Sequence, residues 1–279
     1  MRKRRSKREI KYLRERIYFI IHEDAPMTCR QVFYRMVSEG LIDKTENEYT
    51  NTCCRLLVKM RRNEELPYGW IADNTRWMIK PISHSNLENM LVETAKCYRK
   101  SLWNDLNVNV EIWLEKDALS GVLYQETDGW DVPLMVTRGY PSLTFLHEAG
   151  EHLKNSKKPA YIYFFGDYDP SGVDIPRVVE KLLREFAPNI EINFEILAVT
   201  GEDQIKEFNL ITRPTKSSDS RAKNFKGESV EVDAIPSKIL REMAHKVISN
   251  HVPAAHLKKI LETEKLERET LMQIAPLIT

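Results

Sequence analysis

Carboxylates follow two stretches of the sequence that have the composition of buried strands. Glu115 comes directly after the expected strand 108–114, and Asp167 and Asp169 come just after the apolar run 161–165. A charged group that directly follows five apolar strand residues needs a partner, because burial of an unpaired charge is costly. Asp169 also has a structural explanation, since Asp-Pro-Ser-Gly is a typical helix start with Asp at the N-cap.

These carboxylates predict a metal site if the two strands are neighbours. In a doubly wound sheet, ligands bind beyond the carboxyl ends of the strands, where the winding reverses. Glu115, Asp167 and Asp169 would then converge and repel one another, and oxygen-only ligation of this kind suits Mg²⁺, with Mn²⁺ as a substitute. Such a metal stabilises the attacking and leaving oxygens in phosphodiester chemistry.

Strands and helices alternate after residue 106, which is typical of a doubly wound α/β sheet with mostly parallel strands. The expected strands are 108–114, 133–137, 161–165, 192–199 and 230–232, and the expected helices are 118–125, 142–153 and 175–186. A polar loop at 213–226 carries five basic residues, which either follow a DNA backbone or stay solvated. An amphipathic helix at about 254–275 ends the sequence.

The first 80 residues predict a winged helix-turn-helix. A basic segment at 2–8 is expected to be a disordered tail ahead of a first helix, and Thr-x-x-Gln and Thr-x-x-Glu capping boxes at 28 and 45 open two further helices. Two short β-like pieces, 66–71 and 74–79, then predict a hairpin. The third helix, 46–62, would enter the major groove with the basic side chains Arg55, Lys59, Arg61 and Arg62. A small helical bundle without a ligand is the alternative.

Composition supports a two-domain protein that binds a polyanion. Residues 1–100 carry 21 Lys and Arg against 13 Asp and Glu, whereas residues 101–279 carry 21 against 28. No apolar run approaches the roughly 18 residues of a membrane span, and no secretory signal, Cys-x-x-Cys pair or glycine-rich nucleotide motif occurs. We therefore expect a cytoplasmic, nucleoid-associated protein with no membrane partner. The expected division is 1–80, a helical linker at 81–105, 106–250 and a C-terminal helix at 251–279.

Several motifs in one order resemble the topoisomerase VI A subunit and the related meiotic double-strand-break protein, a family with a winged helix followed by a Toprim domain. The matching segments are 110–118, 136–142 and 166–172, and 231–235 is similar to a later strand of that family. Residues 28–34 resemble the family's winged-helix motif, in which the second aromatic residue is a tyrosine nucleophile. Gln31 stands where the family has Asp, and Phe33 is the first aromatic residue. The resemblance covers about residues 8–250.

The resemblance implies a Mg²⁺-dependent DNA-cleaving transesterase. Tyr34, with Arg30 beside it, would attack a phosphodiester of double-stranded DNA and become joined to a 5′ phosphate, while Glu115, Asp167 and Asp169 hold the metal. It also implies a homodimer, in which the tyrosine of one chain meets the metal of the other, and a separate ATPase subunit as a partner.

Two basic residues lie beside the carboxylate motifs. Arg138, at the end of the second strand, is expected to contact DNA phosphate. Lys116 is expected to be a solvated neighbour of Glu115 or a weak phosphate contact.

The residues of the second helix, taken alone, favour a different role for Tyr34. On a helix of about 100° per residue, Tyr34 lies roughly 130° from the centre of the apolar face, beside Arg30 and Gln31. This position is typical of an exposed tyrosine that stacks on DNA or contacts a partner chain. Two other functions therefore stay open: a metal-dependent nuclease of the same fold that hydrolyses DNA in a mobile-element or phage-defence context, and a DNA-binding protein without catalysis.

Overall fold

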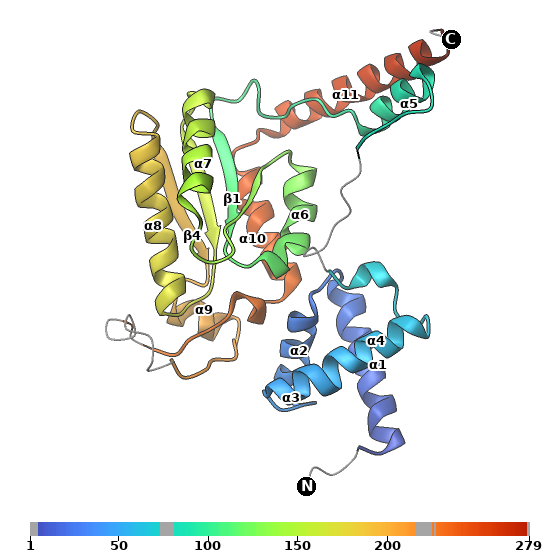
Figure 1. Cartoon of the computed structure of the whole chain (residues 1–279), viewed down its shortest axis with the longest axis vertical. Helices are drawn as coiled ribbons and strands as arrows, with labels where there is room; N and C mark the ends of the chain where they lie inside the picture. The colour runs from blue at the N-terminus through green and yellow to red at the C-terminus, as the bar shows by residue number, and fades with distance from the viewer. Residues whose placement is uncertain (1–4, 73–80, 216–224, 226, 278–279) are drawn as a thin grey trace.

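The structure is a computed structural model that describes residues 5–72, 81–215, 225 and 227–277. A helical N-terminal part lies below an α/β part, and a two-helix arm projects from the α/β part (Figure 1). The candidate carboxylates belong to the α/β part and the candidate tyrosine to the helical part.

Four parallel strands form the sheet in the order β2-β1-β3-β4. The strands are β1 (Asn109–Leu114), β2 (Leu134–Val136), β3 (Ala160–Phe165) and β4 (Ile192–Ala198). This arrangement confirms the α/β class with a parallel, Rossmann-like sheet. The chain passes from β1 outward to β2 and then returns to β3 on the other side of β1, so the winding reverses between β1 and β3.

The strand expected at 230–232 is wrong. Val230 makes only an isolated antiparallel bridge with Tyr168, and a short 3₁₀ helix, η5 (Val232–Ala234), follows. The physical reason is that the backbone N–H of Val232 donates to the Asp167 carboxylate at 2.8 Å, so a side chain takes the donor that a strand ladder would use. The segment therefore lies across the strand ends.

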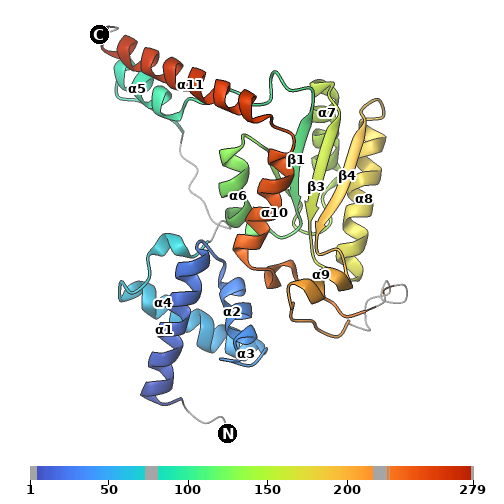
Figure 2. The same cartoon turned by 180° about the vertical axis from the view of Figure 1, so that it is seen from behind.

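Helices cover both faces of the sheet (Figure 2). On one face, α6 (Ser120–Gly129) and α10 (Ser237–Ser249) pack against Ile112 and Leu114 of β1, and on the other face α7 (Leu143–Ser156) and α8 (Pro170–Phe186) pack against Trp113. Because both faces are covered, β3 is continuously apolar, as a parallel strand of this class is, whereas β1 contains the buried Glu111. A short helix, α9 (Glu202–Glu207), follows β4.

The start of α8 is fixed to the loop after β3. A Cβ at Gly172 would collide with the backbone carbonyl of Asp167, so only glycine fits in this first turn. The loop that carries Asp167 and Asp169 is therefore held closely against the helix that follows it.

The N-terminal part is a bundle of α1 (Lys7–Asp24), α2 (Cys29–Ser38) and an interrupted third helix. The helix expected at 46–62 begins as α3 (Glu46–Glu48), widens into a π-helix, η1 (Tyr49–Cys54), and ends as α4 (Arg55–Arg62). The capping box of α2 is present. The expected tail is wrong from residue 6 onward, because Ser6 caps α1 with a second capping box.

The hairpin of the expected winged helix is not found among the described residues. Residues 66–71 contain a 3₁₀ turn, η2 (Tyr68–Trp70), and Ile71 makes a parallel bridge with Met27. The second arm, 74–79, lies outside the described residues. The winged helix thus stays a prediction, and the structure shows a helical bundle.

The linker and the C-terminal helix form the arm. α5 (Leu87–Cys97) packs along α11 (Ala254–Ile274), and Glu267 of α11 accepts hydrogen bonds from Tyr98 and Lys100 at 2.5 and 2.9 Å. No helix among the described residues is both long and apolar enough to cross a membrane.

Polar contacts join α1, α2 and the following loop to the α/β part. The buried Asp24 accepts from the backbone N–H of Lys238 at 2.5 Å and pairs with Arg241 at 3.2 Å. Gln31 Nε2 donates to the carbonyl of Ile235 at 3.5 Å, and Lys44 Nζ donates to the carbonyls of 211 and 212 at 3.2 and 2.9 Å. These contacts place α2 against the segment that contains η5.

Candidate functional site

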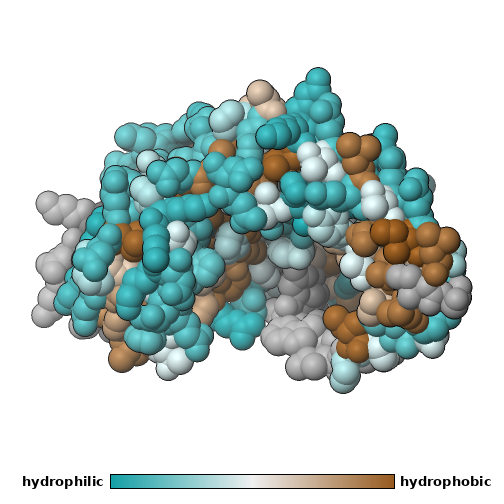
Figure 3. All heavy atoms as spheres, turned by 90° about the horizontal axis from the view of Figure 1, so that it is seen from above, coloured by the Kyte–Doolittle hydropathy of each residue, from teal (hydrophilic) through white to brown (hydrophobic). Residues whose placement is uncertain are grey.

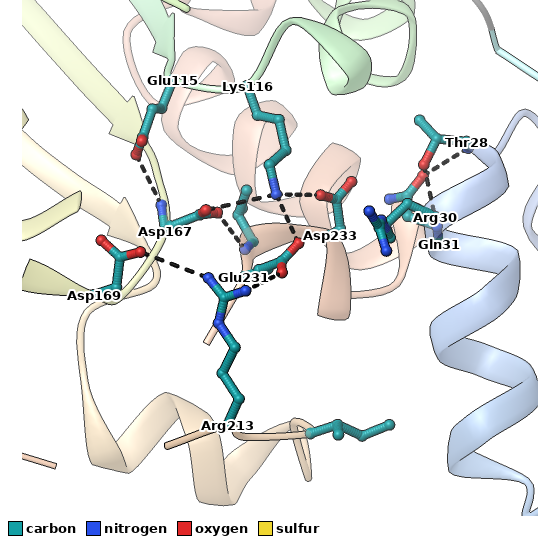
Figure 4. A network of polar contacts seen from close by, with 12 residues as sticks. Thr28, Arg30, Gln31, Glu115, Lys116, Asp167, Asp169, Arg213, Glu231 and Asp233 are labelled. Atoms are coloured by element: carbon teal, nitrogen blue, oxygen red, sulfur yellow. Dashed lines mark hydrogen bonds and ion pairs between the residues drawn. The ribbon is translucent and has the colours of Figure 1, made fainter. Parts of the chain in front are cut away.

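The first two carboxylates meet at the carboxyl ends of β1 and β3. These strands are neighbours in register, with Leu114 opposite Phe165, so the residues that follow them lie together. The backbone N–H of Asp167 donates to Oε2 of Glu115 at 3.1 Å (Figure 4). The structure thus brings Glu115 and Asp167 together at the point where the winding reverses, as the sequence pattern indicates.

Asp169 lies next to Glu115 and Asp167, and its two carboxylate oxygens make different contacts. Oδ1 accepts from the backbone N–H groups of Ser171 and Gly172 at 2.9 and 2.8 Å, so Asp169 is the N-cap of α8. Oδ2 lies 3.7 Å from Nη2 of Arg213. The structural explanation of Asp169 is therefore confirmed, and one oxygen faces the cluster.

Lys116 is the centre of the polar network, which corrects the expectation of a solvated neighbour. Its Nζ lies 2.5 Å from Asp233 Oδ2, 3.1 Å from Glu231 Oε2 and 3.5 Å from Asp167 Oδ2. Burial alone would lower the pKa of Lys116, but Asp233, Asp167 and Glu231 together raise it above its ordinary value. Lys116 is therefore a fixed cation among carboxylates.

Glu231 and Asp233 extend the site; the sequence pattern placed Glu231 in a strand, and the family resemblance covered both residues without giving either a role in the site. Glu231 also pairs with Arg213 at 2.8 Å; burial would raise the pKa of Glu231, but Lys116 and Arg213 lower it overall. Burial raises the pKa of Asp233, and its buried Oδ1 has no hydrogen-bond partner among the described residues. Counting Glu115, Asp167 and Asp169, five carboxylates thus surround two cations.

The carboxylate oxygens of Glu115, Asp167 and Asp169 are hard donors that lie close together. Burial, followed by the nearby charges of Asp167 and Asp169, raises the pKa of Glu115 to about 7. Carboxylate oxygens that repel one another in this way are the ligands that Mg²⁺ and Mn²⁺ prefer. No ready-made group of three metal ligands occurs among the described residues. A divalent cation could be held here only if Glu115, Asp167 or Asp169 turned from the position observed.

Tyr34 is buried, with 4% of its surface exposed, which corrects its expected exposure. The helical wheel places Tyr34 off the apolar face of α2, and this apolar face packs against the other helices of the N-terminal bundle. Tyr34 is covered because the other side of α2, which carries Gln31, packs on the segment around Ile235. Burial, followed by the charge of Glu231, raises the pKa of Tyr34 above its ordinary value, while Lys116 and Arg30 act in the opposite direction.

Arg30 lies on α2 beside the loop that carries Asp233 (Figure 4). Its guanidinium is 4.0 Å from the centre of the Tyr49 ring and 3.4 Å from Glu46. Its charge also helps to lower the pKa of Glu231. Tyr34 and Arg30 therefore lie, within one chain, close enough to Glu231 for its charge to act on both of them.

The expected DNA-binding residues lie apart from this cluster. Arg55 and Lys59 line a groove of about 910 Å³ between α1 and the third helix. Arg61 lies over the ring of Tyr68, 5.7 Å from its centre. Further cations that line the groove are Arg5, Lys7, Lys11 and Arg14.

The other two expected DNA-binding residues, Arg62 and Arg138, are exposed. Arg62 ends α4 with an exposed side chain, and Arg138 is an exposed residue with φ of 55° that pairs with Asp117 at 3.1 Å. In the basic loop 213–226, Arg213 binds carboxylates, and Lys216, Arg221, Lys223 and Lys226 lie outside the described residues.

Comparison with protein-family models, curated proteins and solved structures gave no match for this chain. The resemblance to the topoisomerase VI A family therefore stays a prediction from the quoted motifs.

The raised pKa of Glu115 predicts a pH-dependent stability. Between the ordinary value of 4.5 and about 7, the folded protein holds a proton that the unfolded chain has lost. Wild-type stability therefore falls as the pH rises through this range, and Glu115→Gln removes the effect. Without metal, we expect the free energy of unfolding of the variant, relative to that of wild type, to increase by about 1–3 kcal/mol when the pH rises from about 5 to about 8. Urea unfolding in a chelator measures this difference.

Glu148→Gln, at an exposed position on α7, is the matched control and should change little at either pH. A stability difference between wild type and Glu115→Gln that is the same at both pH values would contradict the assignment.

Proposed function

We propose that this chain is a Mg²⁺-dependent enzyme that breaks double-stranded DNA. The observation that carries the proposal is the convergence of Glu115, Asp167 and Asp169 at the sheet edge where the winding reverses, with Tyr34 close enough to Glu231 for its charge to act on the phenol. Carboxylates at such an edge are suited to a metal that acts on a phosphodiester.

The residues of this chain have defined roles in that reaction. The metal, when bound by Glu115, Asp167 and Asp169, supplies positive charge at the phosphate. Tyr34 supplies the phenolic oxygen that bonds to phosphorus while the bond to the 3′ oxygen breaks. The phenolic proton of Tyr34 passes to water, and the departing 3′ oxygen takes a proton from water. Arg30, one turn before Tyr34 on α2, provides charge for the phosphate.

The contacts around α2 require a movement before Tyr34 can reach DNA. Tyr34 is covered by the α/β part, and Gln31 and Lys44 hold this arrangement by hydrogen bonds to backbone carbonyls. These bonds are few and polar, and water or phosphate can replace them. We infer that DNA binding separates α2 from the segment around Ile235.

The burial of Tyr34 also favours a second candidate, a nuclease that hydrolyses DNA. A tyrosine with a raised pKa keeps its proton and is a weak nucleophile in the arrangement observed. In this alternative the same carboxylates hold Mg²⁺, water attacks the phosphate, and Tyr34 serves the packing between the two parts.

The partners of the proposed enzyme are DNA and a second copy of the chain. The groove with Arg55 and Lys59 suits a DNA backbone, because its cations can replace the counterions of phosphates. Apolar side chains gather at the end of the molecule formed by α5 and α11 (Figure 3), where Leu266 is 63% exposed and Leu277 79% exposed. This arm supports the predicted homodimer, since exposed apolar patches mark interaction surfaces.

A supercoiled-plasmid assay with Mg²⁺ or Mn²⁺, quenched in denaturant and run with and without protease, separates the candidate functions. We expect broken DNA that enters the gel only after protease, because the proposed product carries protein on its ends. Tyr34→Phe should then reduce cleavage by at least about 1,000-fold, since the variant lacks the attacking oxygen. Asp167→Asn should abolish cleavage in both samples.

Tyr18→Phe, at a partly exposed position on α1, is the matched control and should cleave as wild type does. Cleavage that ignores protease and survives in Tyr34→Phe would exclude the transesterase and leave the nuclease. No cleavage with either metal would contradict both enzymatic functions.

The basic groove makes a separate prediction about DNA affinity. Arg55→Ala with Lys59→Ala should weaken duplex binding and reduce the slope of log affinity against log salt by about two, because two phosphate contacts are lost. Fluorescence anisotropy at several salt concentrations measures this slope. Lys181→Ala with Lys258→Ala removes equal charge from exposed positions on α8 and α11. An equal change of slope in both pairs would contradict a DNA-binding groove.

A further inference from the structure

Three of the four cysteines lie together in the N-terminal bundle. Cys29 is the first residue of α2, and Cys53 and Cys54 are the last two residues of η1. Sγ of Cys53 is 3.8 Å from the carbonyl oxygen of Cys29, and Cys54 is the next residue along η1. Cysteine side chains from two different helices therefore form one cluster.

We propose that Cys29 and Cys54 are a redox-modification site, at which a peroxide oxidises the two thiols to a disulfide that joins α2 to η1. The proposal concerns the redox state of the bundle and does not depend on the DNA chemistry of the carboxylate site.

The surroundings make Cys54 the reactive thiol of the pair. The hydrogen bond from Cys29 lowers the pKa of Cys54 to about 6, burial opposes this shift, and a hydrogen bond from Tyr49 and the charge of Arg30 support it. Glu46 is the facing group that acts in the opposite direction. Cys29 keeps its proton, because that hydrogen bond and burial raise its pKa. A thiolate beside an arginine is the environment of a redox-sensitive cysteine.

Accessibility separates this pair from the third thiol. Cys29 and Cys54 are partly exposed, whereas Cys53 is completely buried, and burial raises the pKa of Cys53 above its ordinary value. Cys53 is therefore expected to be inert. Cys97, on α5, is exposed but lies in the arm, outside this cluster.

The reaction is balanced with one peroxide as the two-electron oxidant. The Cys54 thiolate attacks a peroxide oxygen, the O–O bond breaks, the other oxygen leaves as hydroxide or alkoxide, and Cys54 becomes a sulfenic acid. The Cys29 sulfur then attacks the Cys54 sulfur; the S–S bond forms, the S–O bond breaks, and the oxygen leaves as water with the proton that Cys29 gives up. A dithiol reductant reverses the step by thiol–disulfide exchange.

The position of the pair gives the modification a structural consequence. Cys29 begins the helix that carries Arg30 and Tyr34, and Cys54 directly precedes Arg55 of the basic groove. The disulfide would tie the start of α2 to the π-helix and fix the orientation of α2 within the bundle. π-Helical turns occur frequently at functional sites.

Peptide mapping under non-reducing conditions tests the proposal on the full chain. After treatment with hydrogen peroxide we expect a cross-linked peptide that joins Cys29 to Cys54 and disappears on reduction. Cys54→Ser should abolish it, and Cys53→Ala and Cys97→Ser, the matched controls, should retain it. Circular dichroism checks that each variant is folded.

A second measurement keeps the proposal testable if Cys54→Ser does not fold. In wild type, the rate of iodoacetamide alkylation at Cys54 should reach half of its maximum near pH 6, whereas an ordinary thiol requires a pH of about 8.5. Oxidation that links Cys53 to Cys54, links chains through Cys97, or leaves all thiols free would overturn the proposal. Alkylation of Cys54 with an ordinary pH profile would do the same.

Discussion

The ammonium group of Lys116, held between Asp167, Glu231 and Asp233, is the interaction on which the site depends. It joins the end of β1 to the loop after β3 and to the segment that enters η5. If Lys116 were absent, buried carboxylates would be left without their cation, and such an uncompensated charge costs about 3–5 kcal/mol. Lys116 therefore sets the positions of the carboxylates before any ligand binds.

The same segment connects the carboxylates to the N-terminal bundle. Glu231 and Asp233 bind Lys116, and two residues later the carbonyl of Ile235 accepts from Gln31 of α2. The charged cluster and Tyr34 thus lie on either side of one short stretch of chain. Movement of α2 away from that stretch would expose the tyrosine and leave the carboxylates in place, because Lys116 and Arg213 hold them within the α/β part.

The parts of this arrangement that depend on local sequence could be predicted, and the parts that depend on distant contacts could not. The four strands follow from mostly apolar runs, and the meeting of Glu115 with Asp167 follows from the carboxylates that come after two of these runs. The role of Lys116 could not be predicted, because two of its partners, Glu231 and Asp233, lie more than 100 residues away. The burial of Tyr34 could not be predicted either, because a helical wheel describes one helix and contains no information about the segments that pack on it. The π-helix likewise has no local signal in the sequence.

Titration with Mn²⁺, followed by electron paramagnetic resonance, tests most directly whether Glu115, Asp167 and Asp169 hold a divalent cation. The account predicts that wild type binds Mn²⁺ and that Asp167→Asn weakens binding by at least about tenfold, as loss of a charged ligand should. Asp203→Asn, at an exposed position on α9, should bind Mn²⁺ as wild type does. Equal binding by wild type and folded Asp167→Asn, or no binding by wild type, would contradict the account.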